Sequence, residues 1–449
     1  MEKLSSCQNL CGYRDIWKLT YPIILGSVAQ HLITLTDTAF MGRVSVVGLG
    51  AVGLAGIFYL VVVLMGLGMG TGAQIIMARR HGEGNFSDIG KVFEQSLYLL
   101  AALALGMFLL FQSAVPVLMK EIIKSSEVYE QVMAYLMVRC WGLFFANANM
   151  AFRAFLIGTS NTLVITWSTF FMAGINILLN YALIFGRFGF PKMGIAGAAL
   201  ASVIAEASAT LFLFVYTGRS GFQKTFALFR FRGLDIKLIV RILRISAPVM
   251  LQHFLSIGGW FAFFWLIESM GPRSLAISNM IRAIYIIMMI PVFGFAAATN
   301  TLVSATIGKG GPDLVMATIA RIIRLTLLVV SITAVLILTF PGTILRLYTS
   351  DTALIGRSLP ILYVITVAAL FFSIGWVLFN GISGTGNTHV SLMIEIVLII
   401  FYLFWAYLMV HRVSAPLHLV WTAEIVYASL VGVTSLAYLK FGRWREKKI

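Results

Sequence analysis

The sequence predicts an all-α membrane protein in which twelve transmembrane helices form two pseudo-symmetric six-helix lobes. Three observations support this prediction: long runs without charged residues, an uneven distribution of basic residues, and an internal repeat. The chain has 449 residues, of which 60% are hydrophobic and only 11% are charged. A soluble domain usually carries about 25% charged residues, so the composition disfavours a soluble enzyme, a disordered chain and a disulfide-rich scaffold.

The charge-free runs are long enough to cross a membrane. No Asp, Glu, Lys or Arg occurs in residues 44–78, 154–186, 283–308 and 358–394. Each run exceeds the roughly 20 residues that a helix needs to span a bilayer. Only helices and closed barrels span lipid, and barrel strands are short and alternate in polarity. Helices are therefore expected at 16–41, 47–74, 92–118, 130–152, 160–186, 194–217, 237–270, 275–307, 314–342, 354–382, 388–411 and 416–440.

The basic residues predict the orientation. When the N-terminus is assigned to the cytoplasm, most Lys and Arg residues fall in the cytoplasmic connections, above all in and around residues 218–236, and in the C-terminal tail. This bias is the positive-inside pattern. We expect a multi-pass protein of the bacterial inner (plasma) membrane with both termini in the cytoplasm. The formal net charge of +16 then reflects contact with anionic lipid headgroups, and no nucleic-acid partner is expected.

The chain repeats itself at an offset of 226 residues (384 minus 158). Phe152–Thr162 reads FRAFLIGTSNT and aligns with Leu378–Thr388, LFNGISGTGNT, and the same offset pairs Pro22 with Pro248. Such recurrence predicts two six-helix halves, and an even number of helices makes the repeat parallel. The expected domains are an N-lobe at 1–217, a cytoplasmic linker at 218–236 and a C-lobe at 237–449. Halves of this kind usually enclose a central cavity and rock against each other, as in alternating-access transporters.

One acid is expected to have polar neighbours at its own depth. Placing an ionisable side chain inside a membrane helix costs free energy, so each such residue is expected to have a structural or functional role. Asp37 lies one turn from the outer end of the first helix, while Asn176 and Asn180 share one face of the fifth. Ser202 lies at a similar depth on the sixth helix, and Glu206 follows it by one turn as a possible relay. These hard oxygen donors suit Na⁺ or H⁺, and hydrogen bonding between helices is the alternative explanation.

The second half lacks this cluster. The positions equivalent to its four residues are Phe263, Tyr402, Ala406 and Ala428. Polar residues that stabilise the fold should occur in both halves of a repeat, whereas a binding site that the protein needs only once can occur in one half. For two other buried acids, Glu395 and Glu424, a structural and a functional role are equally open. For Glu268 and Arg139 a local hydrogen bond or a side chain that reaches towards the membrane surface is favoured.

The second half is instead rich in aromatic residues. Phe263, Phe264, Phe372 and Trp376 are candidate walls of a substrate cavity, because aromatic faces bind flat cations through stacking and cation–π contacts. Packing or lipid contact explains most of them equally well.

No enzyme motif is present. The sequence contains no GxxxxGK[ST], HExxH or GxSxG pattern, so neither ATP hydrolysis nor hydrolase chemistry is expected. An ion gradient is then the expected energy source. We expect no cofactor besides the coupling ion, no metal other than a possible Na⁺, and a monomer.

Four segments resemble the MATE (multidrug and toxic compound extrusion) family of bacteria, in its NorM/DinF-like form. They are YPIIL at Tyr21–Leu25, DTAFMG at Asp37–Gly42, GLGA at Gly48–Ala51, and the Arg153…Gly158…Asn161-Thr162 repeat segment. The resemblance covers nearly the whole chain. It implies a secondary active antiporter that exports cationic, amphipathic drugs in exchange for Na⁺ or H⁺. The wider superfamily also contains flippases of lipid-linked oligosaccharide precursors, which is the alternative function.

The resemblance also implies roles for residues. It makes Asp37 the key cation-binding acid of the N-lobe, and the two amides and the hydroxyl its network, although some members have Asp where this chain has Asn180. NorM-type members also use an acid in the first and in the fourth C-lobe helix, where this chain has Ser256 and Phe372. The N-lobe site is therefore the candidate. Cation binding would neutralise Asp37, shift the populations of the lobe states and lower the local affinity for a cationic drug. The neutral amide oxygens slightly favour Na⁺.

Overall fold

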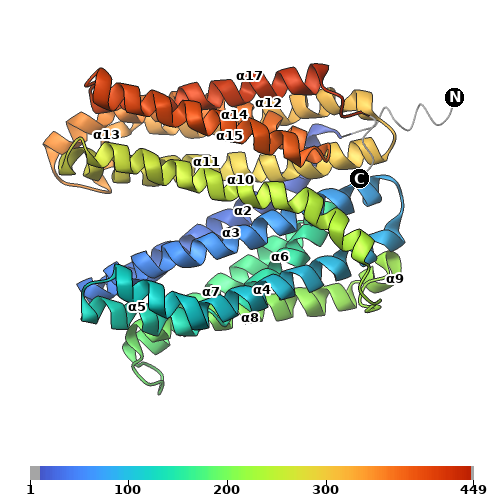
Figure 1. Ribbon diagram of the computed structural model, residues 1–449, viewed down its shortest axis with the longest axis horizontal. Coiled ribbons are helices and arrows are strands. Elements are labelled where there is room, and N and C mark those ends of the chain that lie inside the picture. The colour runs from blue at the N-terminus through green and yellow to red at the C-terminus, as the bar shows by residue number, and fades with distance from the viewer. Residues whose placement is uncertain (1–10, 446–449) are drawn as a thin grey trace. The chain divides into compact units, whose positions relative to one another are not determined.

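The computed structural model describes residues 11–445, and every regular element in this range is a helix (Figure 1). Eleven of these helices are long and apolar enough to span a membrane. A twelfth span results if α5 (Ser126–Arg139) and α6 (Gly142–Gly158), which are bent by 48° to each other, are counted as one. The predicted all-α membrane fold is confirmed.

The remaining elements are divided between the two halves of the chain. In the first half they are α2 (Tyr13–Gly42), α3 (Val46–Gly82), α4 (Phe86–Ile122), α7 (Leu163–Phe185), α8 (Gly194–Arg219) and the short α9 (Phe222–Phe226). In the second half they are α10 (Ile236–Glu268), α11 (Pro272–Gly308), η1 (Pro312–Leu314), α12 (Val315–Thr339), α13 (Pro341–Arg346), α14 (Thr352–Gly384), α15 (Thr388–Tyr407), η2 (Leu408–Arg412), α16 (Leu417–Val420) and α17 (Ala423–Phe441). Most of the long helices follow the predicted spans closely, although α4 extends beyond the predicted 92–118 at both ends, and the short α9 and α13 were not predicted.

Two spans differ from the sequence prediction for local reasons. α3 continues eight residues past its predicted end at 74, because basic residues in its last turn interact favourably with the helix dipole. The span predicted at 130–152 is broken at Cys140–Trp141. There Trp141 N–H bonds the Val138 carbonyl and Leu143 N–H bonds the Cys140 carbonyl, and such i to i−3 hydrogen bonds tighten the helix.

By its contacts the chain divides into two compact units. The first unit is Tyr21–Met250, and the second comprises the residues up to Thr20 and those from Leu251 onward. Both boundaries fall inside long helices, beside Pro22 of α2 and Pro248 of α10. A proline lacks the N–H that would complete the helical ladder, so each boundary lies within three residues of a position where the helix lacks a backbone donor.

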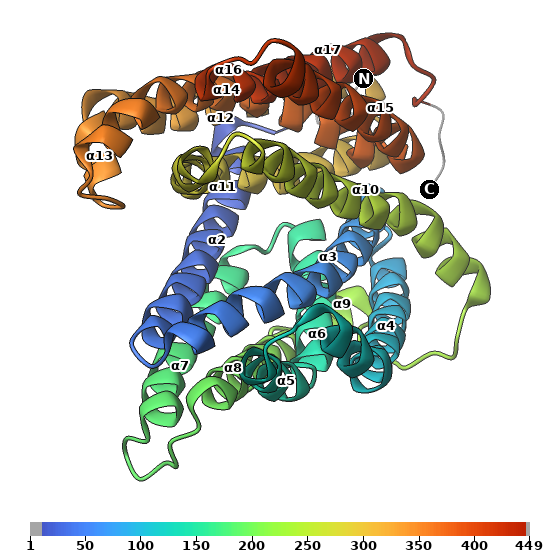
Figure 2. The same ribbon diagram turned by 60° about the vertical axis from the view of Figure 1, so that its left-hand side comes forward.

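In the first unit, α3 packs against α4, α5 and α6, and α8 packs against α5, α6 and α7. α7 and α8 form an antiparallel pair joined by a loop (Figure 2). The turn begins at Gly186, whose φ of 69° is left-handed, and a Cβ there would lie 2.9 Å from the Cβ of Lys192. α2 runs parallel to α7, since two hydrogen bonds join matching ends of the helices. The Thr166 hydroxyl near the start of α7 donates to the Pro22 carbonyl at 2.6 Å, and Asn180 near its end donates to Asp37 near the end of α2.

The basic connection after α8 is fixed to α4. The buried carboxylate of Glu94 accepts the backbone N–H groups of three consecutive residues, Arg230, Phe231 and Arg232, at 2.6, 3.1 and 3.2 Å. The neighbouring Gln95 donates to the Gly233 carbonyl at 3.1 Å and accepts from the Asp235 N–H at 3.2 Å. This stretch of the predicted linker is thus held to the first unit by directed hydrogen bonds.

We expect Glu94→Ala to release this connection. Three backbone donors would lose a charged acceptor, and each hydrogen bond to a charged group is worth about 1.5–3 kcal/mol. Limited trypsin digestion should then cut among the basic residues at 219–232 faster than in the wild type. The matched control is Glu83→Ala, which removes only a partly exposed pair with Arg80, an interaction of small worth. Equal digestion rates for both variants would contradict the anchoring role.

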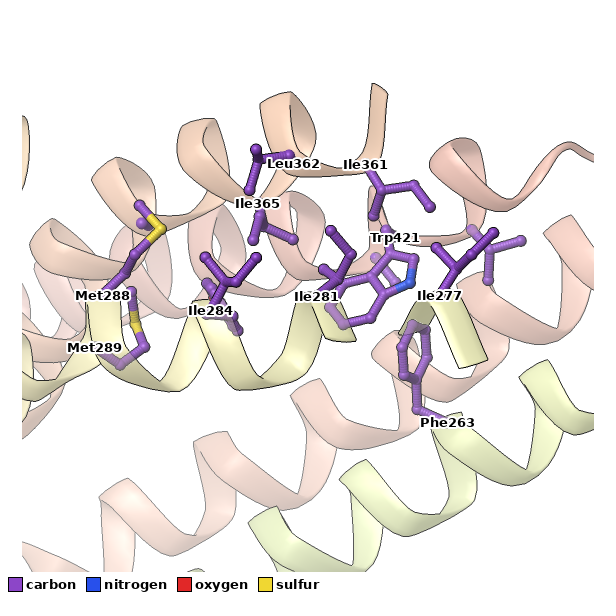
Figure 3. Packing of buried hydrophobic residues seen from close by; sticks show 14 of the residues in the cluster. Phe263, Ile277, Ile281, Ile284, Met288, Met289, Ile361, Leu362, Ile365 and Trp421 are labelled. Atoms are coloured by element: carbon purple, nitrogen blue, oxygen red, sulfur yellow. The ribbon is translucent and has the colours of Figure 1, made fainter. Parts of the chain in front are cut away.

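The second unit has a densely packed apolar core. In Figure 3, side chains of α11, among them Ile277, Ile281 and Ile284, form a row that faces side chains of α14. Trp421 fills the end of this core and is fully buried. Its indole N–H donates to the Ser278 hydroxyl at 3.1 Å, so the ring is buried without an unpaired donor.

Candidate functional site

The four residues predicted as a cation site form one continuous chain of hydrogen bonds. The Asn180 amide donates to Oδ1 of Asp37 at 2.5 Å and to Oδ1 of Asn176 at 2.9 Å. The Asn176 amide in turn lies 3.3 Å from the hydroxyl oxygen of Ser202. The chain connects α2, α7 and α8, so the predicted convergence of these side chains is what the structure shows.

Helical geometry explains why Asp37 is the group that α2 directs at α7. The neighbouring hydroxyls of Thr36 and Thr38 each donate to a carbonyl one turn earlier, at 2.8 Å, which satisfies them within their own helix. An ionised carboxylate has no hydrogen to donate to a carbonyl of its own helix. Asp37 instead accepts a hydrogen bond from the facing helix. Asn176 and Asn180 lie four residues apart on α7 and therefore present their amides on one face.

The carboxylate of Asp37 is more exposed to solvent than the other three side chains of the hydrogen-bonded chain. Asn176, Asn180 and Ser202 are 1%, 0% and 8% exposed, whereas Asp37 is only partly buried. Oδ1 of Asn180 is buried and has no hydrogen-bond donor. Among the described residues no Lys or Arg forms an ion pair with Asp37. The site therefore offers one accessible carboxylate and, behind it, one buried amide oxygen that accepts no hydrogen bond.

Glu206 does not continue this chain. Its Oε1 and Oε2 lie 2.5 and 2.7 Å from the two terminal nitrogens of Arg139, a bidentate ion pair. Arg139 itself is 7% exposed, so the expected local hydrogen bond or reach towards the surface is corrected to a buried ion pair. A relay role for Glu206 stays a prediction.

The equivalent positions in the second unit form an apolar contact. Phe263 occupies the position of Asp37 and its ring centre lies 5.3 Å from that of Tyr402, which stands where Asn176 does. Ala406 and Ala428, in place of Asn180 and Ser202, are buried. The equivalent positions thus hold an aromatic ring contact here and a carboxylate–amide chain in the first unit.

The two remaining acids are buried among neutral donors. Oε1 of Glu424 accepts from the Tyr402 hydroxyl at 2.8 Å and from the Trp260 indole at 3.2 Å, and Oε2 from the Tyr285 hydroxyl at 3.3 Å. Glu395 contacts the Ser256 and Tyr427 hydroxyls at 2.5 and 2.9 Å. The structural role that the sequence left open for both acids therefore has named partners.

We expect Glu424→Leu to destabilise the second unit by about 1–3 kcal/mol or more, because it leaves buried donors unpaired. Glu424→Gln should cost much less. Its oxygen can accept from Tyr402 and Trp260, while its amide donates to the Tyr285 hydroxyl oxygen. Thermal unfolding of purified protein in detergent measures the difference. Equal losses of stability in the two variants would show that the charge, rather than the hydrogen bonding, is what matters.

The aromatic candidates divide into two groups. Phe263 is fully buried and packs edge-on against Trp421, so in this conformation it belongs to the core and lines no open cavity. Phe264 lies under the guanidinium of Arg282, 4.9 Å from the ring centre. Phe372 stacks on Trp376 with ring centres 5.0 Å apart, and both rings are partly buried. Their part in a substrate cavity stays a prediction.

Comparison with known proteins identifies the family. The family model MatE matches residues 22–182 and 248–408. Its two matches begin 226 residues apart (248 minus 22), which is the offset of the sequence repeat. The chain belongs to the MATE family. The same model thus matches each half of the chain once, which confirms the duplication predicted from the sequence.

Relatives of this MATE chain include a "Probable multidrug resistance protein NorM" from Thermotoga maritima, which is 27% identical over 448 residues, covering 97% of this chain and 94% of the relative. A protein of the same name from Synechocystis sp. is 27% identical over 342 residues, 75% of this chain and 73% of that protein. Two solved structures share the fold. One is a MATE protein in complex with MaL6, with a TM-score of 0.89, 20% identity and 95% coverage of both chains. The other is an outward-facing multidrug resistance MATE family transporter, with a TM-score of 0.88, 21% identity and 97% coverage of both chains.

Proposed function

We propose that this protein is a secondary active multidrug efflux transporter that exports cationic amphipathic compounds in exchange for Na⁺ or H⁺ by alternating access. The observation that carries the proposal is the hydrogen-bonded chain from Asp37 to Ser202, with its accessible carboxylate. The multidrug resistance names of full-length relatives support the substrate class. The absence of ATP-binding and hydrolase motifs from the sequence supports a gradient as the energy source.

The chemistry of the site supports cation binding. Ionised Asp37 carries the charge, and the buried amides behind it fix its position through the hydrogen bond from Asn180. A proton would convert the carboxylate to a neutral acid. A Na⁺ ion would use the carboxylate together with hard oxygens such as the unused Oδ1 of Asn180, if the amide turns. Either cation removes the negative charge that attracts a cationic drug, so binding of the ion and of the drug oppose each other.

Alternating access then follows from differential binding. A ligand shifts a conformational equilibrium only as far as its affinities for the two states differ. The cation site lies in the first unit alone, since the equivalent positions of the second unit are aromatic and apolar. We propose that neutralising Asp37 changes the populations of the inward- and outward-open states. We further propose that both termini face the cytoplasm of a bacterial inner membrane and that the protein works as a monomer.

The test is ethidium efflux from cells or everted vesicles in which Na⁺ and H⁺ gradients are imposed separately. Efflux that follows one gradient and stops when it is collapsed supports the proposal and identifies the coupling ion. An efflux rate that changes with neither the Na⁺ nor the H⁺ gradient would falsify the proposal. The flippase alternative is not favoured by the comparisons, and a lipid pyrophosphate would require a cationic cavity. Transfer of a lipid-linked oligosaccharide analogue between leaflets, without drug efflux, would support it instead.

A further inference from the structure

A second charged group lies beside the proposed cation site. Arg139 is the last residue of α5 and Glu206 lies in the middle of α8, and their side chains are 9% and 17% exposed. The two guanidinium nitrogens bond the two carboxylate oxygens one to one. Such bidentate pairs are the strongest that arginine forms with carboxylates.

The surroundings are shaped to hold this pair. The guanidinium carbon of Arg139 lies 3.9 Å from the ring centre of Tyr59 on α3, a cation–π contact. Gly142, at the start of α6, leaves the necessary space. A Cβ there would come within 2.7 Å of Oε2 of Glu206 and would also collide with the guanidinium. The break between α5 and α6 therefore positions both the arginine and the glycine that accommodates it.

The pair also lies within electrostatic reach of Asp37. Glu206 follows Ser202 by one turn of α8, and Ser202 ends the hydrogen-bonded chain that begins at Asp37. The charged and titratable groups that act on Asp37 are Arg139 and Glu206, and those that act on Arg139 are Glu206, Tyr59 and Tyr135. The three charged side chains carry two negative charges and one positive charge. Although a guanidinium is present, Asp37 takes its hydrogen bond from the neutral amide of Asn180.

We propose that Glu206 is a positioning residue that holds the Arg139 guanidinium away from Asp37 and so keeps Asp37 open to the transported cation. The proposal rests on the proposed function, in which Asp37 binds that cation. A guanidinium is permanently charged and matches a carboxylate in shape. An unrestrained arginine at this place would occupy Asp37 as an internal cation. Glu206 satisfies it instead and leaves the site one net negative charge, which a single monovalent cation neutralises.

The proposal predicts shifts of opposite sign for the two partners. Glu206→Gln frees the guanidinium to pair with Asp37, so the half-saturating cation concentration should rise by more than about tenfold. Arg139→Gln removes the competing charge and leaves a second carboxylate, so that concentration should fall several-fold. The double variant Arg139→Gln/Glu206→Gln should return close to the wild-type value, because it has neither the competitor nor the extra acid.

The experiment measures cation-dependent stabilisation of the purified full-length protein in detergent. Thermal unfolding midpoints are recorded against NaCl, with choline chloride to hold the ionic strength, and separately against pH. A ligand that binds the folded state raises the midpoint according to its affinity. A merely structural ion pair would lower the midpoint of both single variants and leave the half-saturating concentrations of both probes unchanged. The proposal is overturned if the half-saturating cation concentrations of Glu206→Gln and Arg139→Gln shift in the same direction or do not shift.

The Asp37→Asn variant separates this proposal from the proposed function. If it keeps the cation-dependent stabilisation, or if the wild type shows none with either probe, the proposed function fails and the inference with it. If it loses the stabilisation but the two single variants do not shift in opposite directions, only the positioning role fails. Should a Gln variant not fold, Glu206→Asp and Arg139→Lys keep the charges and disturb only the bidentate geometry. They should shift the half-saturating concentration upward.

Discussion

Replacement of Asp37 by asparagine is expected to abolish gradient-coupled efflux, to below about a tenth of the wild-type rate, because the site then has no charge for a cation to neutralise and no differential binding with which to shift the lobe states. The fold should be intact. The asparagine oxygen can accept the hydrogen bond from Asn180 that Oδ1 of Asp37 accepts now. Ethidium efflux from whole cells, normalised to the amount of protein in the membrane, measures the effect.

The control for this variant is Glu268→Gln. Glu268 is another acid of a long helix, but it is the last residue of α10 and lies with Trp265 and His411 along an open surface pocket. Its replacement should leave efflux within about twofold of wild type, as is usual for surface substitutions outside a site. Normal efflux by Asp37→Asn would remove this carboxylate from the mechanism. A loss in both variants would indicate a general sensitivity to the loss of acids.

Gly72→Leu is expected to prevent most of the protein from folding, because Gly72 lies where the backbones of α3 and α10 come close together within the first unit. A Cβ at this position would lie 2.7 Å from the Cα and 2.8 Å from the Cβ of Ser246. At Gly68, one turn earlier, a Cβ would lie 2.6 Å from the Cα of Met250. Backbone atoms cannot rotate away as a side chain can, so the cost should exceed the typical overpacking range of about 1–3 kcal/mol.

The same helix provides the matched control. A Cβ at Gly53, also on α3, would meet nothing within 4 Å, so Gly53→Leu should be tolerated. The amount of monodisperse protein extracted from membranes, judged by size-exclusion chromatography, compares the two variants. If Gly72→Leu yields as much folded protein as Gly53→Leu, the close helix approach has no energetic importance. Residues 50–72 contain seven glycines. The sequence does not distinguish them, whereas the structure separates those packed against another helix, such as Gly68 and Gly72, from those with open space, such as Gly53.

Much of the fold could be predicted from the chain because hydrophobic length and charge placement are local properties. Runs such as 283–308 have one way to exist in lipid, as helices, and the offset of 226 follows from comparing letters. The break at Cys140–Trp141 could not be predicted in this way. The hydrophobic span predicted at 130–152 continues across these two residues without a change in polarity. The bend depends on i to i−3 hydrogen bonds, which the composition of the span does not reveal.

The site was predictable where one helix presents residues at helical spacing. Asn176 and Asn180 had to share a face, and their depth relative to Asp37 followed from the orientation of the spans. The partner of Glu206 was not predictable, since its position one turn after Ser202 suggested an extension of the same cluster. The choice between Ser202 and Arg139 as its neighbour depends on the rotation of α8 and on the end of α5, which only packing sets.

By itself the sequence determined that the chain crosses the membrane in twelve spans, that its two halves are copies, and that only the first half keeps a carboxylate with two amides. The tertiary structure decided which charges meet. It paired Arg139 with Glu206, left Asp37 with a neutral amide, and surrounded Glu395 and Glu424 with hydroxyl and indole donors. The physical reason is that burial and spacing along a helix are encoded in the order of residues, whereas the partner of a buried charge depends on how helices rotate and cross.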